Sequence, residues 1–355
     1  MGLNESWSQP SYVSTRLQGV PNPTRLSTFM STRAFSRREF VSAFSIGLGT
    51  RCLVGCAHVG GRPEPRRIVW GEATADPRIL QQTVTFTSGE DNVPALLAYP
   101  RAAGQHPAVL VIHASWLIEP YVGETVAMLA QAGFVGLAVD LFHFFPKVSS
   151  WEGARRAQGA ETAKLIETEF RERRMVSNLQ SGIDYLRKQP FTRPGAVGVI
   201  GFCGGGWNAL LFGAQSNDIG AVVAYYAPVG SSNIQHRAPL DLASYIRVPV
   251  QYHGVRADPN APPPDVDRFQ ALLAAQGTVF ERHTYDAEHG FFAYDRTGIF
   301  KAADAAASWQ RTVTFLRTNL RRPPSWRELA PPARDNTDNR ARARTAGDHL
   351  FFHHH

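Results

Sequence analysis

The chain has few cysteines, no long apolar run and no excess of charge over most of its length. Only three cysteines occur among 355 residues, and Cys52 and Cys56 lie four positions apart near the N-terminus. A fold held together by a disulfide framework is therefore excluded. No uninterrupted apolar stretch reaches the ~18 to 20 residues that a membrane-spanning helix requires, so the mature protein is not expected to cross a bilayer.

The formal net charge of +7 comes from the two ends of the chain. Residues 1–56 and 321–355 hold the excess of arginine, while acidic and basic side chains balance over residues 57–320. A basic surface for nucleic acid is therefore not expected on the body of the protein. The composition, 43% hydrophobic and 19% charged, is that of an ordinary globular enzyme.

Residues 1–56 have the features of a leader. The segment Ser36-Arg37-Arg38-Glu39-Phe40-Val41 opens an apolar stretch that ends at Gly49, and this pattern resembles a twin-arginine export signal. Leu53-Val54-Gly55-Cys56 resembles a lipobox, which would make Cys56 a lipidated N-terminus attached to a membrane. Residues 1–29 belong to neither signal, so Met30 is the expected first residue of the translated protein. We expect an exported protein, periplasmic or membrane-anchored, or a cytoplasmic one if the leader is not functional.

The body of the protein is expected between residues 80 and 320, after a linker over 57–79 and before a disordered basic tail over 321–355. Short aliphatic runs alternate with longer amphipathic ones, which predicts one α/β domain with a mainly parallel sheet and helices on both faces. The expected strands cover 83–87, 95–99, 108–112, 134–139, 196–200, 222–226, 248–252 and 279–285. The expected helices cover 122–132, 151–171, 175–188, a stretch from Trp207, and 302–320.

A candidate nucleophile follows the strand expected over 196–200. That strand leads directly into Gly201-Phe202-Cys203-Gly204-Gly205-Gly206 and then into a helical stretch. Such a turn strains the backbone of its central residue, and the flanking glycines remove side chains that would clash. The sulfur of Cys203 would lie at a helix N-terminus, which favours a thiolate. A buried structural cysteine and a phosphate-binding loop are the alternatives, although the loop lacks the Lys-Ser/Thr of a P-loop.

An acid and a base follow this turn in the order that such a hydrolase needs. Asp258 comes after the strand expected over 248–252, and His289 comes after the strand expected over 279–285. The carboxyl ends of parallel strands form the edge at which open α/β sheets bind ligands. Three residues that are distant in sequence are therefore expected to meet there.

Residues 82–320 resemble the dienelactone hydrolase family of α/β-hydrolases. The matching segments are Val139-Asp140-Leu141-Phe142, Gly201 to Gly205, His253-Gly254 through Asp258, and His289-Gly290-Phe291. The resemblance implies Cys203 as nucleophile, His289 as base and acid, and Asp258 as the residue that orients His289. It also implies backbone N–H groups of Gly204 and Ser115 as the oxyanion hole, and lactones as the first substrate class. The chemistry requires neither a metal nor an organic cofactor.

One position departs from the family pattern. Family members commonly carry a carboxylate that helps to activate the thiol, where this chain has Ala114. Either His289 and the helix dipole ionise the thiol alone, or His113 substitutes; His113 can also be a structural histidine at a strand end. Arg296 and Arg155 are the nearest candidates to hold a substrate carboxylate, unless they are surface charges.

Three aromatic residues, Trp116, Trp207 and Phe292, flank the expected site and favour an apolar or aromatic substrate. The leading hypothesis is a hydrolase of small esters or lactones that works through a thioester, as a monomer or homodimer. One alternative is an exported, lipid-anchored binding protein that kept the fold and lost turnover. Another is a redox-sensing thiol, although the body holds no second cysteine.

Overall fold

The computed structural model describes residues 68–114, 117–144, 171–230 and 237–320. The expected leader with Cys56, most of the linker, the C-terminal tail, Ser115 and Trp116 lie outside the described residues. The helix expected over 151–171 also lies outside them, except for its last residue. In the part of the chain that is described, no helix is both long enough and apolar enough to cross a membrane.

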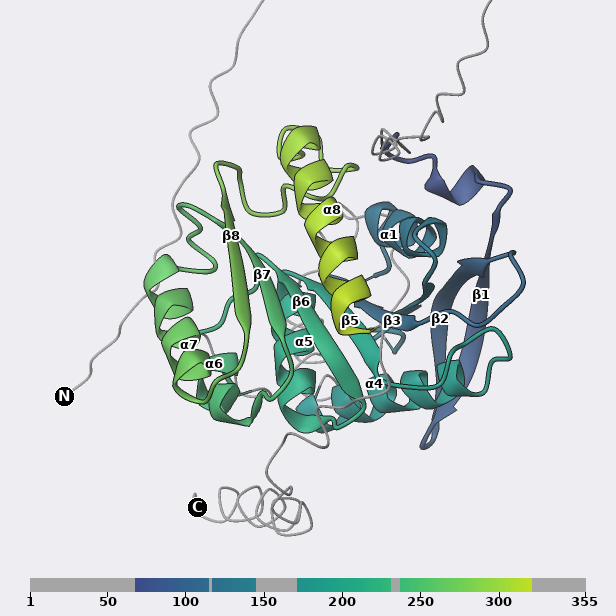
Figure 1. The fold of residues 1–355 in the computed structure, drawn as a ribbon, viewed down its shortest axis with the longest axis horizontal. Helices are drawn as coiled ribbons and strands as arrows, with labels where there is room; N and C mark the ends of the chain where they lie inside the picture. The colour runs from purple at the N-terminus through teal and green to yellow at the C-terminus, as the bar shows by residue number, and fades with distance from the viewer. Residues whose placement is uncertain (1–67, 115–116, 145–170, 231–236, 321–355) are drawn as a thin grey trace, which may run out of the picture. The chain divides into compact units, whose positions relative to one another are not determined.

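An eight-stranded sheet forms the centre of the fold (Figure 1). Its strands are β1 (Ile79–Ser88), β2 (Asp91–Pro100), β3 (Ala108–Ile112), β4 (Val135–Val139), β5 (Val197–Phe202), β6 (Ile219–Tyr225), β7 (Val250–Val255) and β8 (Phe280–Tyr285). They lie in the order β1-β2-β4-β3-β5-β6-β7-β8. β1 and β2 form an antiparallel pair and β2 is antiparallel to β4, whereas all other neighbours are parallel. The predicted opening hairpin and mainly parallel sheet are confirmed.

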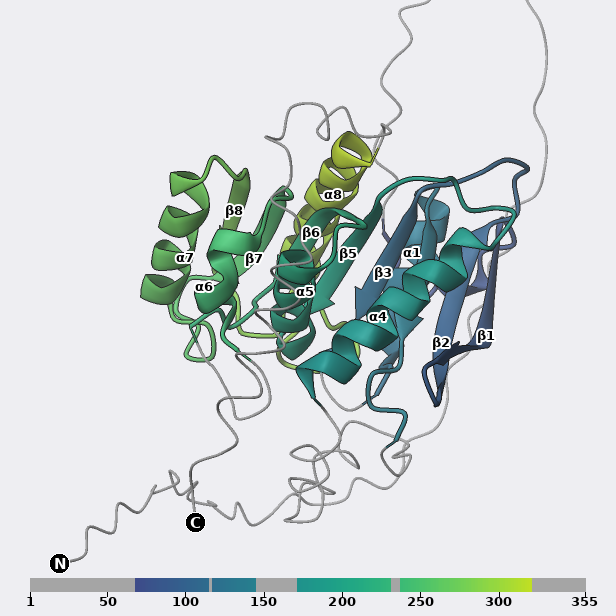
Figure 2. The same ribbon diagram turned by 90° about the horizontal axis from the view of Figure 1, so that it is seen from below.

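Helices cover both faces of the sheet (Figure 2). One face carries α1 (Pro120–Gln131) and α8 (Ala302–Asn319); the other carries α4 (Glu172–Arg187), α5 (Gly204–Gln215), α6 (Pro239–Leu242) and α7 (Pro263–Ala275). Two short 3-10 turns, η1 (Ala73–Ala75) and η2 (Ala243–Tyr245), complete the described elements. The sequence analysis did not predict α7, because the proline run at its start reads as a loop.

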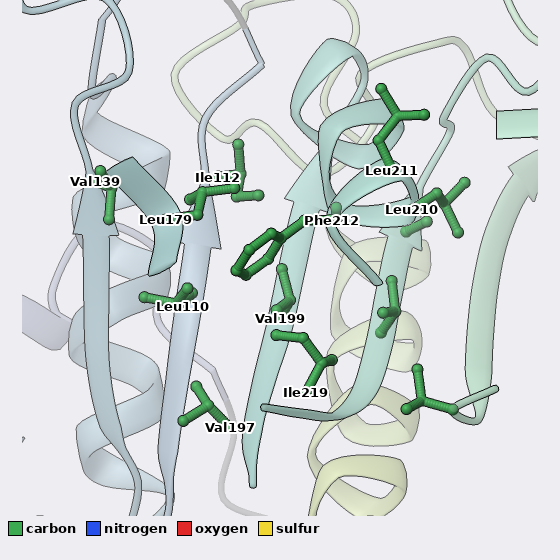
Figure 3. Packing of buried hydrophobic residues seen from close by; sticks show 14 of the residues in the cluster. Leu110, Ile112, Val139, Leu179, Val197, Val199, Leu210, Leu211, Phe212 and Ile219 are labelled. Carbon is green, nitrogen blue, oxygen red and sulfur yellow. The ribbon is translucent and has the colours of Figure 1, made fainter. Parts of the chain in front are cut away.

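The central strands are apolar throughout because both of their faces are covered. Every residue of β3, β4 and β5 is buried, as parallel strands between two helix layers require. On one face, Leu110 of β3 and Val199 of β5 belong to the same cluster as Leu179 of α4 and Phe212 of α5 (Figure 3). Burying one side chain of this size stabilises the fold by about 1.5–3 kcal/mol.

The sheet brings distant residues to one edge. β5, β6, β7 and β8 are parallel neighbours, so the residues that follow them lie at the same end of the sheet. Cys203 follows β5, Tyr226 follows β6, Asp258 lies three residues after β7, and His289 lies four residues after β8. The expected convergence of the site residues therefore has its basis in the strand order.

Candidate active site

Cys203 occupies a strained position between a strand and a helix. β5 ends at Phe202 and α5 begins at Gly204, and Cys203 between them has φ +52° and ψ −118°. Such a positive φ is rare outside glycine and costs of the order of 1–3 kcal/mol. The N–H of Cys203 donates to the carbonyl of Tyr225 at 2.9 Å, which fixes the turn on β6. Its side chain is partly exposed and free of any disulfide.

The glycines around Cys203 are required by the close approach of backbone to backbone. A Cβ on Gly201 would lie 2.1 Å from the carbonyl oxygen of Gly205, and a Cβ on Gly205 would lie 2.4 Å from those of Ile112 and His113. α5 therefore begins against the ends of both β5 and β3. Gly204, the expected oxyanion donor, is the first residue of α5 and lies against the carbonyl of Ala114.

His289 and Asp258 are hydrogen-bonded to each other at this edge. Nδ1 of His289 lies 2.8 Å from Oδ2 of Asp258, whose side chain is almost fully buried. The other carboxylate oxygen of Asp258 accepts the N–H groups of Asn260 at 2.9 Å and Ala261 at 3.3 Å. Asp258 is thus held by its own loop and fixes the ring of His289, with the proton on Nδ1. Nε2 of His289 is buried and has no hydrogen-bond partner among the described residues.

The surroundings of His289 favour its charged form. Burial opposes the positive charge, but the hydrogen-bonded carboxylate of Asp258 and the nearby sulfur of Cys203 raise the pKa of His289 to about 9. The ring of Tyr226 packs against the imidazole with 4.9 Å between ring centroids. An imidazolium beside a sulfur is the arrangement that stabilises a thiolate.

Two buried tyrosines complete the surroundings of the sulfur. Tyr121 at the start of α1 and Tyr226 after β6 are each about 1% exposed. Burial raises the pKa of both hydroxyls, and the nearby Arg296 acts in the opposite direction. The hydroxyl of Tyr121 has no hydrogen-bond partner within the described part of the chain. Tyr226 has φ +38°, so strained backbone occurs after both β5 and β6.

Arg296 forms a buried ion pair with Glu119. Nη2 of Arg296 lies 2.9 Å and 3.0 Å from the two carboxylate oxygens of Glu119. The side chains are 15% and 2% exposed, so the reading of Arg296 as a surface charge is wrong. Burial raises the pKa of Glu119, although the positive charge of Arg296 acts in the opposite direction. Arg296 was expected to hold a substrate carboxylate, but the carboxylate of Glu119 already binds its guanidinium group.

Glu119 is a functional candidate that sequence reasoning missed. It is an isolated acid just before Pro120 at the start of α1, and nothing in the local pattern pairs it with an arginine 177 residues later.

His113, the expected substitute for the family carboxylate, is 1% exposed, and its Nε2 accepts the N–H of Leu141 at 3.2 Å. This bond favours the structural reading of His113 over a role in thiol activation. Ala114, where the family carboxylate was expected, contributes no acid to the site.

The expected substrate-binding aromatics differ in their surroundings. Phe292 is 1% exposed and packs against Phe202, Tyr225 and Trp70, with ring centroids 4.9–5.4 Å apart. It is therefore a core residue beneath the site and does not face a substrate. Trp207 is partly buried in the first turn of α5, and its backbone N–H donates to the carbonyl of Cys203 at 3.0 Å. Trp116 and Arg155 lie outside the described residues.

No group of three or more His, Cys, Asp or Glu side chains in the described ranges is placed to hold a metal ion. The groups that the structure brings to this edge are a thiol, an imidazole, a carboxylate and backbone N–H groups. This is a donor set for acyl transfer.

Comparison with known proteins agrees with this geometry. The sequence profile of the dienelactone hydrolase family matches residues 93–320, which is more than half of the chain. The chain belongs to the dienelactone hydrolase family.

Curated relatives with similar sequences carry related names. A Synechocystis sp. protein named as a candidate carboxymethylenebutenolidase is 26% identical over 245 residues, covering 67% of this chain and 96% of that protein. A Bradyrhizobium sp. protein named as a candidate 2-oxo-3-(5-oxofuran-2-ylidene)propanoate lactonase is 28% identical over 241 residues, covering 66% of this chain and 92% of that protein.

Solved structures with this fold include a candidate dienelactone hydrolase from Klebsiella pneumoniae. It is 22% identical to this chain, with a TM-score of 0.60, and the match covers 67% of this chain and 98% of that one. A dienelactone hydrolase-like promiscuous phosphotriesterase from metagenomic libraries is 18% identical, with a TM-score of 0.57, over 68% of this chain and 99% of that one. The α/β-hydrolase fold predicted from the sequence is confirmed.

Membership of the dienelactone hydrolase family makes this protein an ester or lactone hydrolase. A small lactone or ester substrate is consistent with this family. The alternative of a binding protein without turnover receives no support from the family or from the curated relatives.

Proposed function

We propose that this dienelactone hydrolase family member cleaves a small lactone or ester by covalent catalysis, with Cys203 as nucleophile, His289 as base and acid, and Asp258 as the residue that orients His289. The observation that carries the proposal is the hydrogen bond of 2.8 Å between His289 and Asp258, at the sheet edge where Cys203 is partly exposed. The raised pKa of His289, about 9, keeps the imidazole protonated at neutral pH, which supports its role as the acid that protonates the leaving oxygen.

In the acylation step, the sulfur of Cys203 attacks the carbonyl carbon and the carbonyl oxygen becomes an oxyanion. The N–H of Gly204 is placed at the start of α5, where it can donate to that oxygen, and the N–H of Ser115 is the second expected donor. Nε2 of His289 then gives its proton to the leaving oxygen as the C–O bond breaks. The product of this step is a thioester on Cys203 and a free hydroxyl group, which stays on the same molecule if the substrate is a lactone.

In the deacylation step, the now neutral His289 removes a proton from a water molecule through Nε2. The hydroxide attacks the thioester, the sulfur leaves as a thiolate, and a carboxylic acid is released. Asp258 keeps the proton of the imidazole on Nδ1 throughout, so that Nε2 alone exchanges protons with the substrate and water.

The charges at the site favour a neutral substrate. Arg296 is paired with Glu119, so an incoming carboxylate would have to compete with a buried carboxylate held at 2.9 Å. Relatives named for lactone hydrolysis support lactones as the class, while this ion pair disfavours a lactone with an acidic side group. A small uncharged lactone or short-chain ester fits the described residues best.

The export of this enzyme is a separate proposal, based on the twin-arginine-like segment around Arg37 and Arg38 and the lipobox-like segment that ends at Cys56. Fractionation of cells that express the full chain would test it. Export predicts loss of the leader and recovery in the periplasm or membrane fraction, with a lipid mass on Cys56 in the anchored form. Recovery only in the cytoplasm with residues 30–56 attached would contradict it.

The catalytic proposal is tested by mass spectrometry and kinetics on the full chain. Short-chain p-nitrophenyl esters and simple lactones are compared as substrates, and the reaction is quenched during turnover. An acyl mass on the peptide that contains Cys203, absent from Cys203→Ala, is the expected result. Full activity in Cys203→Ala, with a native circular dichroism spectrum, would overturn the assignment of the nucleophile.

A further inference from the structure

The residues just before the sheet are packed against the active-site region. Residues 68–78, here called the N-terminal strap, precede β1 and include the turn η1; the sequence analysis assigned them to a linker. In Figure 1 they form the purple start of the described chain, next to α1. Ala73 is 4% exposed and Trp70 is partly buried, so this part of the expected linker belongs to the folded body.

The strap is fastened to α1 by one buried carboxylate. Oε1 of Glu124 accepts the N–H of Gly71 at 3.0 Å and the N–H of Ala73 at 2.9 Å. Glu124 is 1% exposed, and its Oε2 is buried without a hydrogen-bond partner among the described residues. Burial raises the pKa of Glu124, against the opposing effect of the backbone N–H groups of the strap. A single side-chain oxygen thus holds two backbone groups of the strap.

The strap also contacts the loop that carries His289. Residues 286–301, between β8 and α8, are here called the histidine loop. The ring of Trp70 packs in a T-shaped arrangement against Phe292 and Phe300, with ring centroids 5.4 Å and 5.3 Å apart and interplanar angles of 88° and 78°. Gly71 has φ +84°, and a Cβ there would lie 3.3 Å from the ring of Tyr294. Edge-to-face aromatic pairs of this kind add specific stabilisation to the apolar area that they bury.

Two separate links therefore join α1 to the histidine loop. The first is direct, through the ion pair between Glu119 and Arg296. The second runs from Glu124 through the strap to Trp70 and then to Phe292 and Phe300. Glu119 precedes the same helix that carries Glu124, and both links end within eleven residues of His289.

We propose that the N-terminal strap positions the histidine loop, and that Glu124 and Trp70 are positioning residues for His289. The inference rests on the proposed role of His289 in turnover. Phe292 lies three residues after His289 and packs against Phe202, the neighbour of Cys203. A shift of Phe292 therefore changes the placement of the imidazole relative to the sulfur. Loss of the strap contacts is expected to reduce kcat and to leave KM nearly unchanged, because the strap acts on the placement of His289 and is given no part in binding the substrate.

Glu124 offers a matched pair of variants. Glu124→Gln keeps a carbonyl oxygen that can accept both N–H groups of the strap, whereas Glu124→Ala removes the acceptor. Trp70→Phe keeps an aromatic ring against Phe292 and Phe300, whereas Trp70→Leu removes it. Glu72→Ala is the control on the same strap, because Glu72 is exposed and has no side-chain cap contact.

Two measurements on the full chain separate positioning from simple destabilisation. Hydrogen exchange reports the histidine loop directly, because the N–H groups of Phe291, Ala293 and Arg296 are bonded within that loop. The second measurement is the kcat and KM of ester hydrolysis at a temperature where every variant is fully folded.

Glu124→Ala and Trp70→Leu are expected to increase hydrogen exchange over 288–300. They are also expected to lower kcat about ten- to hundredfold, the scale of a misplacement near 1 Å. Glu124→Gln, Trp70→Phe and Glu72→Ala are expected to stay within about threefold of the native kcat on the same scale.

Unchanged exchange over 288–300 and an unchanged kcat in Glu124→Ala, with increased exchange over 68–78, would overturn the proposal. If Glu124→Ala does not fold, Trp70→Leu decides the question by the same two measurements, because Trp70 is the strap residue whose ring contacts Phe292 and Phe300 of the histidine loop. Hydrogen exchange over 288–300 reports the strap and the histidine loop whether or not Cys203 is the nucleophile. Activity retained in Cys203→Ala would refute the proposed mechanism, whereas uncoupled exchange of the strap and the loop would refute only the positioning role.

Discussion

Asp258 uses its two carboxylate oxygens for different purposes. Oδ2 lies 2.8 Å from Nδ1 of His289, while Oδ1 accepts the N–H groups of Asn260 and Ala261. The carboxylate is therefore oriented by its own loop before it orients the imidazole. This arrangement needs no contact between Asp258 and a substrate.

Asp258→Asn tests the orienting role. The amide can present its N–H₂ group to Nδ1 and so favour the tautomer with the proton on Nε2, which cannot act as a base. We expect kcat to fall about 10²- to 10⁴-fold, by analogy with other triads. Pre-steady-state kinetics on a p-nitrophenyl ester separate acylation from deacylation, the step in which His289 acts as a base. A native rate of deacylation in a folded variant would show that His289 does not depend on Asp258.

The raised pKa of His289 predicts a pH dependence of stability. In the folded protein the group titrates near pH 9, whereas an ordinary histidine titrates near 6.5. The stabilisation is therefore fully present below pH 6.5 and is lost as the pH rises through about 9. Its size is as much as ~3 kcal/mol. Urea denaturation at a series of pH values from 6 to 10 is expected to show this loss in the native protein and a flatter profile in His289→Gln; equal profiles would contradict it.

The buried pair of Glu119 and Arg296 predicts strong coupling between two substitutions. Glu119→Gln leaves a buried guanidinium without its counterion, which costs about 3–5 kcal/mol of unfolding free energy. Arg296→Met leaves the opposite charge uncompensated and is expected to cost a similar amount. The double variant removes both charges and is expected to recover a large part of the loss. Chemical denaturation of all four proteins forms a double-mutant cycle, and additive losses would show that the pair is not coupled.

The glycines at the nucleophile turn predict a sharp difference between two glycine-to-alanine changes. Gly205→Ala places a Cβ 2.4 Å from the carbonyl oxygens of Ile112 and His113, and backbone atoms cannot move away cheaply. We expect loss of activity and a large drop in Tm. Gly123→Ala in α1 meets only a side-chain atom of Leu96 at 3.4 Å, so it is expected to stabilise the helix by about 0.5–1 kcal/mol. A native Tm for Gly205→Ala would show that the turn can relax.

The turn around Cys203 could be predicted because its chemistry is local. Gly201, Cys203 and Gly205 follow an apolar run and precede a helical stretch, and only glycine tolerates the close backbone contacts that such a turn creates. Asp258 and His289 could be placed because each follows a run that reads as a buried strand. α7 was missed because its proline-rich start reads as a loop.

The other contacts of the site depend on residues that no local pattern connects. Glu119 and Arg296 are 177 positions apart, and their pairing follows from the position of α1 beside the histidine loop. Phe292 was expected to face the substrate because of its place near His289, yet it lies among Phe202, Tyr225 and Trp70. His113 is held by the N–H of Leu141, which follows the end of β4, so this bond depends on the pairing of β3 with β4.

By itself, the sequence determined the α/β architecture, the strained turn at Cys203 and the order of acid and base, because periodicity, glycine spacing and strand ends are properties of short segments. Only the tertiary structure decided which charges are neutralised, which aromatics form the core and where the packed chain begins. Those outcomes depend on which surfaces meet when helices pack against the sheet. Trp70 packs against the histidine loop, and the N–H of Gly71 donates to Glu124. Because of these contacts, a segment that the sequence predicts to be a linker is part of the folded body.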